Sequence, residues 1–427
     1  MVYGMRNSLS NQAGADEIRV AVIGAGIRAV SYLTNVPEAI RSRVQLVAVA
    51  DPNEKRRRLL MDRFAEWGAP DQYEDGDELL ERASFDVLII GSYNTTHADY
   101  AIKAFKTGAA ILLEKPVATS VDQCRRLWQE FKKAGNERVF IGFVLRYAPF
   151  YRQLQEFLDR QTIGQLLAID ADENLSQSLS SLFLRAWRRD DRVTGGFMVE
   201  KCCHDFDILH MLTGSRVTRV FSMAKRTHFI GRPREEQHRR FDPEYIREIA
   251  LDYGDIHIKK IFEETSDESV YTDSGDVPDH QAVMIEFEDG TLGNFMACLA
   301  QPRATRRIRL FGSNGSLEGD IDRGTIIQDI PFEKHLGAET IIHNICADDS
   351  GHHGADSVLN DAFWDAASGG EVRSMAGIRE GIEASLVGIA VEQSKRLGTP
   401  VDVAAMRREI FGEDEVLKLV EQVSEVV

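Results

Sequence analysis

The stretch from Arg19 to Ala29, RVAVIGAGIRA, constrains this chain more than any other. Its apolar run over residues 20–23 predicts a buried strand that leads directly into a G-x-G-x-x-A turn opening a helix. In such a turn Gly24 permits the tight bend, Gly26 lets the backbone approach a pyrophosphate, and a small third residue lets the helix pack closely on the strand. Amide groups and the positive end of the helix dipole then face the phosphates. Because a glycine-rich turn also occurs without a ligand, the motif predicts a dinucleotide site only together with an acidic residue after the next strand.

An aspartate stands directly after the next apolar strand, Val44–Ala50. A continuous apolar run is typical of a strand covered on both faces of a parallel sheet. Asp51 comes roughly 20 residues after the glycine turn, the spacing at which a carboxylate accepts hydrogen bonds from an adenosine ribose. Since a carboxylate repels a 2′-phosphate, the pattern favours NAD over NADP, although Arg56–Arg58 follow closely and leave NADP possible. The alternative is that Asp51 caps a surface helix before Pro52.

The charge and hydropathy of the chain argue against several classes of protein. Its 427 residues carry 51 Lys and Arg against 68 Asp and Glu, a net charge of −17, and no long basic run, so no nucleic-acid partner is expected. No apolar stretch approaches the roughly 20 residues of a membrane span, and the amino terminus lacks the apolar core of a signal peptide. Five cysteines without framework spacing predict reduced thiols. We therefore expect a soluble, cytoplasmic protein of two or three domains with a flexible leader over 1–17 and no membrane partner.

Strands and helices alternate up to about residue 145, which predicts a doubly wound parallel sheet of the α/β class. Ligands of such folds bind at the carboxyl ends of the strands, where loops come after the predicted strands at 85–91 and 110–113. These loops supply Ser92, Asn94, His97, Glu114 and Lys115. A lysine at a strand end beside a cofactor is a positioned donor whose charge Glu114 would hold, whereas the alternative is an ordinary solvated lysine.

At these residues the chain resembles the Gfo/Idh/MocA family, which comprises glucose-fructose oxidoreductase, inositol dehydrogenase and related proteins. The resemblance extends over nearly the whole chain through GAGIRA, VAVADPN, the Asn94-x-x-His97 helix start, TGAAILLEKP, FVLRYAPFY and KCCHDFDIL. It implies a nicotinamide cofactor, a sugar or cyclitol substrate, a homodimer or homotetramer formed through an exposed sheet face, and a Lys115 that bridges the substrate hydroxyl and the nicotinamide ribose. The expected cofactor-binding residues are Gly24, Gly26, Ile27, Arg28, Asp51, Ser92, Asn94, His97, Glu114 and Lys115.

The resemblance also implies the order of the domains. An NAD(P)-binding Rossmann domain is expected over 18–145, followed over 146–427 by a substrate-binding and oligomerisation domain of the α+β class with a large open, mostly antiparallel sheet. A charged segment at about 227–279 interrupts two predicted strands, at 217–223 and 281–288. We expect an insertion with one or two short helices that covers the substrate cleft or a subunit interface, or that is only a surface excursion.

The segment GGFMVEKCCHDFD is expected to supply catalytic residues besides Lys115. On one continuous helix Glu200, His204 and Asp207 would fall at i, i+4 and i+7 and share a face, which places acidic neighbours around a base. The family resemblance assigns the proton-accepting role to His204. Glu200 stands where the family commonly has Asp, and Lys201-Cys202-Cys203 replaces small residues, so the role of Glu200 stays open.

Other interpretations of these residues compete with catalysis. His204 would be an ordinary core histidine, or the Glu-x-x-x-His spacing would bind a metal with His352, His353 and Asp356 as remote ligands. With no further short-spaced ligand on this helix, no metal is expected. The residues expected to bind substrate are Arg146, Trp187, Asp207 and His353, although His353 would alternatively belong to a helix-capping turn.

The sequence thus predicts an NAD-dependent oxidoreductase that oxidises a secondary hydroxyl of a sugar, glycoside or cyclitol, with Lys115 and His204 holding that hydroxyl. A second hypothesis keeps the cofactor bound. Transient oxidation would acidify the neighbouring C–H, permit elimination of a leaving group and then be reversed, giving a glycosidase or lyase without net redox change. A third hypothesis is a non-catalytic, dinucleotide-dependent regulator, which the presence of both Lys115 and His204 disfavours.

Overall fold

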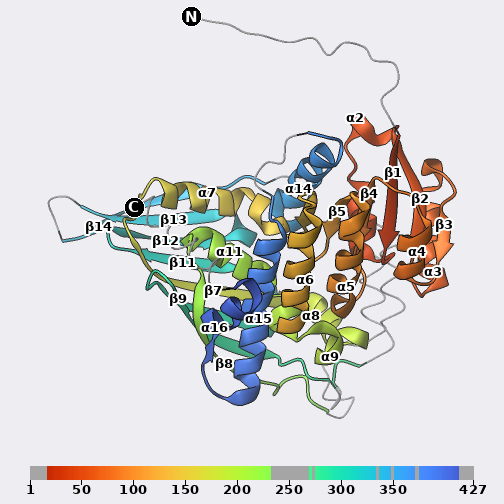
Figure 1. The fold of residues 1–427 in the computed structure, drawn as a ribbon. Helices are drawn as coiled ribbons and strands as arrows, with labels where there is room; N and C mark the ends of the chain where they lie inside the picture. Colours follow the sequence, from red (N-terminus) through yellow and green to blue (C-terminus); the bar gives the residue numbers. More distant parts are fainter. Residues whose placement is uncertain are drawn as a thin grey trace, which may run out of the picture.

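The computed structural model describes residues 17–231, 269–271, 275–332, 336–347, 351–370 and 375–412, and these form two sheets with their helices (Figure 1). The predicted leader therefore lies outside the described residues apart from Glu17. Among the described helices, none is long and apolar enough to cross a membrane.

The first sheet has six parallel strands in the order β3-β2-β1-β4-β5-β6. Its strands are β1 (Ile18–Ile23), β2 (Val44–Ala50), β3 (Asp71–Tyr73), β4 (Val87–Ile90), β5 (Ala110–Leu113) and β6 (Val139–Ile141). Its helices are α1 (Ile27–Thr34), α2 (Glu38–Arg41), α3 (Glu54–Arg63), α4 (Gly76–Arg82), α5 (Asn94–Ala104) and α6 (Val121–Ala134). The central strands β4 and β5 are apolar and buried along their whole length. The doubly wound sheet is thus confirmed, and its strand order reverses between β1 and β4, where such folds form their ligand crevice.

The second sheet has nine strands in the order β14-β13-β12-β11-β7-β10-β9-β8-β15. These are β7 (Leu166–Ser176), β8 (Val217–Lys225), β9 (His280–Phe287), β10 (Leu292–Gln301), β11 (Arg307–Gly312), β12 (Gly315–Asp320), β13 (Thr325–Pro331), β14 (Ala338–Asn344) and β15 (Val401–Asp402). Strands β7 and β10 pair in parallel, and the other described pairs are antiparallel. The predicted α+β domain with a mostly antiparallel sheet is therefore confirmed.

The described α-helices that come after the first sheet are α7 (Pro149–Asp159), α8 (Gln177–Phe183), α9 (Asp191–Thr194), α10 (Phe197–Glu200), α11 (Cys203–Thr213), α14 (Gly351–Ala367), α15 (Ile378–Leu397) and α16 (Val403–Phe411). Among them, α8, α15 and α16 contact strands of the second sheet. The long helix α15 contacts β8, α10 and α11 and also α6 of the first domain (Figure 1). Gly388 permits this close packing, because a Cβ there would lie 2.9 Å from the backbone of Met198. The helix therefore fixes the segment around α10 and α11 relative to the first sheet.

Most of the charged segment predicted as an insertion, 232–268 and 272–274, lies outside the described residues. Its two described ends are joined at the base. The carboxylate of Asp279 accepts hydrogen bonds from the backbone amides of Thr227, His228 and Phe229 at 2.8, 2.6 and 3.1 Å. This tie brings the end of β8 next to the start of β9, which pair as an antiparallel ladder.

Candidate active site

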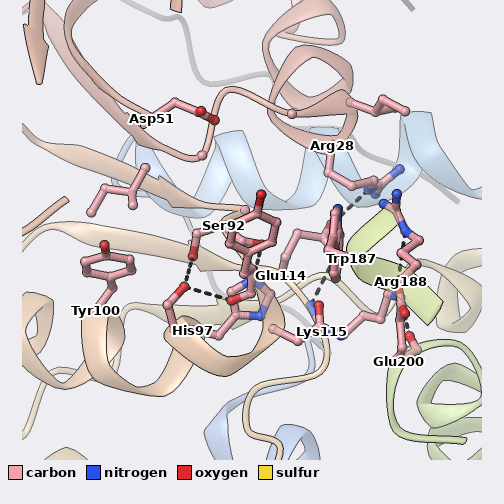
Figure 2. Close-up of a pocket in the computed structure, with 18 of the residues that line it drawn as sticks. Arg28, Asp51, Ser92, His97, Tyr100, Glu114, Lys115, Trp187, Arg188 and Glu200 are labelled. Atoms are coloured by element: carbon pink, nitrogen blue, oxygen red, sulfur yellow. Dashed lines mark hydrogen bonds and ion pairs between the residues drawn. The ribbon is translucent and has the colours of Figure 1, made fainter. Parts of the chain in front are cut away.

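One pocket runs from the glycine turn of the first sheet to the segment between α8 and α11 of the second domain (Figure 2). All ten residues predicted to bind the cofactor line it, and so do the three predicted catalytic residues. We call the part around Gly24, Gly26 and Asp51 the cofactor end. We call the part around Lys115, Arg188, Glu200, His204 and His352 the substrate end.

The glycine turn of the cofactor end is sterically required to contain glycine at its first position. Gly24 has φ of +92°, and a Cβ there would lie 2.5 Å from the backbone carbonyl of Gly91 at the end of β4. At Gly26 the nearest atom to a Cβ would be 3.9 Å away, so that position is open toward the pocket. Helix α1 begins at Ile27 without a capping side chain and without an acidic residue in its first turn. Its positive end is thus suited to receive the pyrophosphate of a dinucleotide.

Asp51 lies at the carboxyl end of β2 with both carboxylate oxygens oriented by backbone amides. Oδ2 accepts a hydrogen bond from the amide of Ala25 at 3.0 Å, and Oδ1 accepts one from the amide of Asn53 at 2.8 Å. Of the three nearby arginines, Arg56 lines the pocket, whereas Arg57 donates to the backbone carbonyl of Asp51. The carboxylate is fixed where the first strand meets the glycine turn, which suits hydrogen bonds to a ribose diol.

Glu114 at the end of β5 lies at the centre of a buried cluster between the two ends. Its carboxylate accepts a hydrogen bond from Arg28 Nε at 2.8 Å and another from the hydroxyl of Tyr32. Arg28 also pairs with Asp356 of α14 at 3.3 Å. Burial would raise the pKa of Glu114, but Arg28 and Lys115 lower it below its usual value. Arg28 is therefore largely committed to Glu114 and Asp356, which limits its predicted role as a cofactor ligand.

The interaction of Lys115 differs from the predicted one. Its Nζ donates a hydrogen bond to the backbone carbonyl of Glu200 at 2.7 Å, and it is the backbone amide of Lys115 that contacts the carboxylate of Glu114, at 3.2 Å (Figure 2). The ammonium group is thus positioned from the second domain, while Glu114 affects it only through the electrostatic field. A side chain of the first domain is held by the backbone of the second, so the substrate end requires both.

The prediction of one continuous helix through Glu200, His204 and Asp207 is wrong. Helix α10 ends at Glu200 and α11 begins at Cys203, because the chain turns at Lys201 and Cys202. The turn directs the carboxylate of Glu200 to Arg188 Nε at 3.0 Å instead of toward His204. Burial raises the pKa of Glu200, and Arg188 and Lys115 oppose that rise.

His204 lies near the start of α11 with a side chain that is buried and yet lines the pocket. Its Nδ1 is buried and has no hydrogen-bond partner among the residues that the structure describes, and its ring packs edge-on against Phe143. Burial lowers the pKa of His204 well below 6.5, and Lys115, Lys201, His352 and Arg306 lower it further. The imidazole is therefore neutral at pH 7, the state in which it can accept a proton.

Ser92 in the loop after β4, and Asn94 and His97 at the start of α5, serve mainly to hold the pocket together. His97 places its two ring nitrogens 2.8 Å from the carbonyl oxygen of Pro116 and 3.1 Å from that of Ser92. Asn94 donates a hydrogen bond to the carbonyl oxygen of Thr194 at 3.1 Å, which joins the two domains. These residues line the pocket as predicted, and their contacts fix the loops after β4 and β5.

Three of the four residues predicted to bind substrate do not line the pocket. Arg146 and Asp207 form a bidentate ion pair, with Nε to Oδ2 at 2.7 Å and Nη2 to Oδ1 at 2.6 Å. His353 points instead to Asp322, with its Nε2 3.4 Å from Oδ1. The fourth, Trp187, does line the pocket, held between the edge of Tyr93 and the guanidinium of Arg188.

The pocket also contains residues that were not predicted to bind cofactor or substrate or to act in catalysis, among them Tyr93, Tyr100, Phe183, Arg188, Lys201 and His352. The signal for His352 was present, because it stands beside His353 in the same turn, but only backbone geometry shows which of the two faces inward. Arg188 and Lys201 give no motif signal, since their positions depend on contacts with distant Glu200 and Glu173. Among the described residues, no group of three or more His, Cys, Asp or Glu side chains is arranged to hold a metal ion.

A pocket that begins at a phosphate-binding turn and ends at a lysine and a neutral histidine defines a dinucleotide-dependent enzyme. The chain belongs to the Gfo/Idh/MocA oxidoreductase family. The model described as "Oxidoreductase family, NAD-binding Rossmann fold" matches residues 18–143, and the model of the family's C-terminal domain matches residues 151–318. NAD(P) is accordingly its cofactor, and the fit of the glycine turn and Asp51 agrees.

Three similar proteins illustrate the relationship. The putative oxidoreductase YteT of Bacillus subtilis is 23% identical over 70% of this chain and 76% of its own length. The scyllo-inositol 2-dehydrogenase (NAD(+)) of the same organism is 25% identical over 70% of this chain and 73% of its own. The structure of levoglucosan dehydrogenase in complex with NADH has a TM-score of 0.68 and 18% identity, and covers 91% of this chain and 99% of that one.

Proposed function

We propose that the protein oxidises a secondary hydroxyl of a sugar, glycoside or cyclitol with NAD as the hydride acceptor. The observation that carries the proposal is that Lys115 and His204 line one end of the pocket whose other end holds the glycine turn and Asp51. A substrate at that end would be placed against both a hydrogen-bond donor and a proton acceptor. Bound NAD supplies the hydride acceptor, and the remaining chemistry falls to the chain's own residues.

His204 is the proposed general base. Burial and the cationic neighbours Lys115 and Lys201 hold its pKa well below 6.5, so at pH 7 the imidazole is neutral and can accept the proton of the reacting hydroxyl. Lys115 is the proposed donor to the substrate oxygen, and the carbonyl of Glu200 orients its ammonium group. Glu200 contributes in this way through its backbone, while its carboxylate holds Arg188 in the pocket wall.

The substrate class is inferred from the residues that line the substrate end and from the names of similar proteins. Trp187 and Tyr93 offer aromatic surface of the kind that packs against the C–H faces of a sugar or cyclitol ring, and Arg188 and Lys201 offer donors for its hydroxyls. Relatives carry the names of inositol 2-dehydrogenase and scyllo-inositol 2-dehydrogenase, and a structural neighbour is named for levoglucosan. These names support a polyol or sugar without choosing among them.

The test is a substrate screen on the purified protein with excess NAD. The panel contains scyllo-inositol, myo-inositol, levoglucosan and methyl glycosides, and each reaction is followed by NADH absorbance and by identification of the product. Oxidation of at least one compound to the corresponding ketone with NADH formed in equal amount supports the proposal. No NADH with any of them, while NAD binds, would contradict it.

A redox-neutral glycosidase or lyase with retained cofactor is the second candidate, and one observation favours it. Besides His204, the substrate end contains a second imidazole, that of His352. Elimination must also remove the acidified C–H proton and protonate the leaving group, whereas net dehydrogenation moves only the one hydroxyl proton. The same screen distinguishes the two, since elimination forms product without net NADH.

We also propose that the exposed face of the nine-stranded sheet mediates self-association. Strand pairing places Met223, Met284, Leu292, Met296 and Phe311 on this face, and all five are at least 40% exposed. Exposed apolar surface of this kind marks an interaction site. Met284→Lys combined with Met296→Lys should convert the assembly to monomers in analytical ultracentrifugation, and a monomeric wild-type protein would contradict the proposal.

A further inference from the structure

Two adjacent histidines at the start of α14 have the same backbone conformation but different surroundings. His352 and His353 have φ of +54° and +57°, and Gly354 comes next at +84°. Such left-handed backbone is uncommon for residues other than glycine, and strained backbone of this kind clusters at active sites and ligand-binding sites. The turn directs His352 into the pocket and His353 toward Asp322, in the short 3-10 segment Ile321–Arg323 between β12 and β13.

Asp356 holds His352 in place. Nδ1 of His352 lies 2.9 Å from Oδ2 of Asp356, and Oδ1 of Asp356 pairs with Arg28, which in turn pairs with Glu114. Gly351 makes room for this arrangement, because a Cβ there would lie 2.2 Å from Oδ2 of Asp356. Burial would raise the pKa of Asp356, but the hydrogen bond from His352 and the charge of Arg28 hold it at about 2. A fully ionised carboxylate therefore supports the imidazole.

His204 and His352 face each other with ring centroids 6.3 Å apart. The side chain of His352 is 34% exposed, whereas His204 is 6% exposed and has cationic Lys115, Lys201 and Arg306 around it. Burial lowers the pKa of His352 below its ordinary value and Arg28 and Lys201 lower it further, whereas the hydrogen bond and charge of Asp356 oppose this shift. A proton received by His204 is thus held unfavourably, and His352 is the neighbouring imidazole with both a carboxylate partner and access to solvent.

We propose that His352 is a second acid–base residue of this site, which carries the substrate proton from the buried His204 to solvent. The hydroxyl loses its proton to His204 as its carbon-bound hydrogen leaves as hydride to the nicotinamide. The proton then passes through a water or a substrate hydroxyl to Nε2 of His352, since Nδ1 is engaged by Asp356, and from there to bulk water. Overall, the alcohol becomes a ketone, the cofactor receives one hydride (two electrons and one hydrogen nucleus), and solvent receives one proton. This proposal rests on the proposed function, which supplies the hydroxyl whose proton His352 carries.

The first test compares His352→Asn with His353→Asn in steady-state oxidation of the best substrate from the screen. Asparagine tolerates left-handed backbone and keeps a side-chain N–H for Asp356 or Asp322, but it does not titrate. His352→Asn should lower kcat by about tenfold or more, because positioned acid–base groups contribute about a hundredfold or more. Added imidazole should restore part of this loss, since it supplies the missing titratable group. His353→Asn should stay within about twofold of wild type, since His353 lies outside the pocket.

The second test needs no substrate, so it separates this inference from the proposed function. Histidine ring signals are titrated by NMR in the NAD complex, with the His204 signal assigned through His204→Ala. Because His352 lowers the pKa of His204, His352→Asn should move the His204 midpoint upward, and His353→Asn should leave it unchanged. If the screen finds no oxidation but the midpoint moves, the proposed function fails and the acid–base coupling stands. An unchanged midpoint, or a loss of kcat that imidazole does not restore, would show that His352 only stabilises the turn.

Discussion

The two ends of the pocket are built by different means. At the cofactor end the important groups are backbone atoms, with a glycine turn, a helix terminus and one aspartate that backbone amides orient. At the substrate end the important groups are mostly side chains from both domains. Lys115 donates a hydrogen bond to the backbone carbonyl of Glu200, and Arg188 donates one to the carboxylate of Glu200. The cofactor end therefore tolerates few changes of shape, whereas the substrate end can be altered one side chain at a time.

This difference explains how a single scaffold can keep its cofactor and change its substrate. The cofactor end results from the strand order of the first sheet, which reverses beside Gly24. The lining of the substrate end depends on how α15 holds α10 and α11, on how α14 packs against Val144–Tyr147 and α7, and on ion pairs such as that of Arg188 with Glu200. Substitutions at the substrate end should thus affect turnover more than NAD affinity, and substitutions at Asp51 the reverse.

The largest effect is expected at the substrate end. Lys115→Met and His204→Ala should each lower turnover by about a hundredfold or more, because each removes a group that handles the reacting hydroxyl. NAD affinity measured by calorimetry should stay near the wild-type value in His204→Ala, since His204 is not among the predicted cofactor-binding residues. The effect of the double variant should fall well short of the product of the two.

The matched control is Lys103→Met on α5, where an exposed lysine pairs with Asp77 away from the pocket. Its turnover should equal that of the wild type. Wild-type turnover in either Lys115→Met or His204→Ala would remove both residues from the proposed mechanism.

The next effect is expected at the cofactor end. The wild-type protein should bind NAD at least about tenfold more tightly than NADP, because a 2′-phosphate against Asp51 should cost more than about 1.4 kcal/mol. Asp51→Asn, which removes the charge and keeps the size, should bring the two affinities closer together. Equal affinities in the wild type, or tighter binding of NADP, would show that Arg56 overrides Asp51.

A smaller effect is expected for Glu200→Gln. The substitution keeps the backbone carbonyl that orients Lys115 and weakens only the charged hydrogen bond to Arg188, so turnover should fall by about tenfold at most. The turnover of Glu200→Gln is measured by steady-state kinetics and compared with that of Lys115→Met. A loss as large as that of Lys115→Met would assign the carboxylate itself to the chemistry.

The smallest effect concerns pH. His204 must be neutral to accept a proton, so activity should be lost only as the pH falls through its pKa, which lies well below 6.5 because of burial and then of Lys115 and Lys201. Lys201→Met removes one of these charges and should move the acid limb of kcat/KM to higher pH. A limb that moves to lower pH, or not at all, would mean that another group controls it.

The sequence was sufficient for the first domain because its signals are local. The spacing from Gly24 to Asp51 and the ends of the strands at 90 and 113 place all ten predicted cofactor residues at one pocket. The substrate end was only partly predictable. A helical spacing suggested that Glu200 and His204 share a face, but the turn at Lys201 breaks the helix and is stabilised by a contact with Glu173 far away in the chain.

The same limit explains the choice between the two histidines of α14. His352 and His353 are equivalent in the sequence, and only the left-handed turn, with Asp356 behind it, determines which one enters the pocket. Likewise, the expected substrate contacts of Arg146 and Asp207 gave way to an ion pair between them. Tertiary pairing of charges cannot be read from spacing along one segment.

The most direct test of the central claim tracks the hydride. Purified protein is given a substrate from the screen with NAD first in excess and then at a small fraction of the substrate concentration, and NADH and product are quantified in both. Net dehydrogenation predicts NADH equal to product in excess NAD, and a reaction that stops when substoichiometric NAD is consumed. Product that accumulates over many turnovers on substoichiometric NAD without net NADH would contradict dehydrogenation and establish the redox-neutral elimination instead.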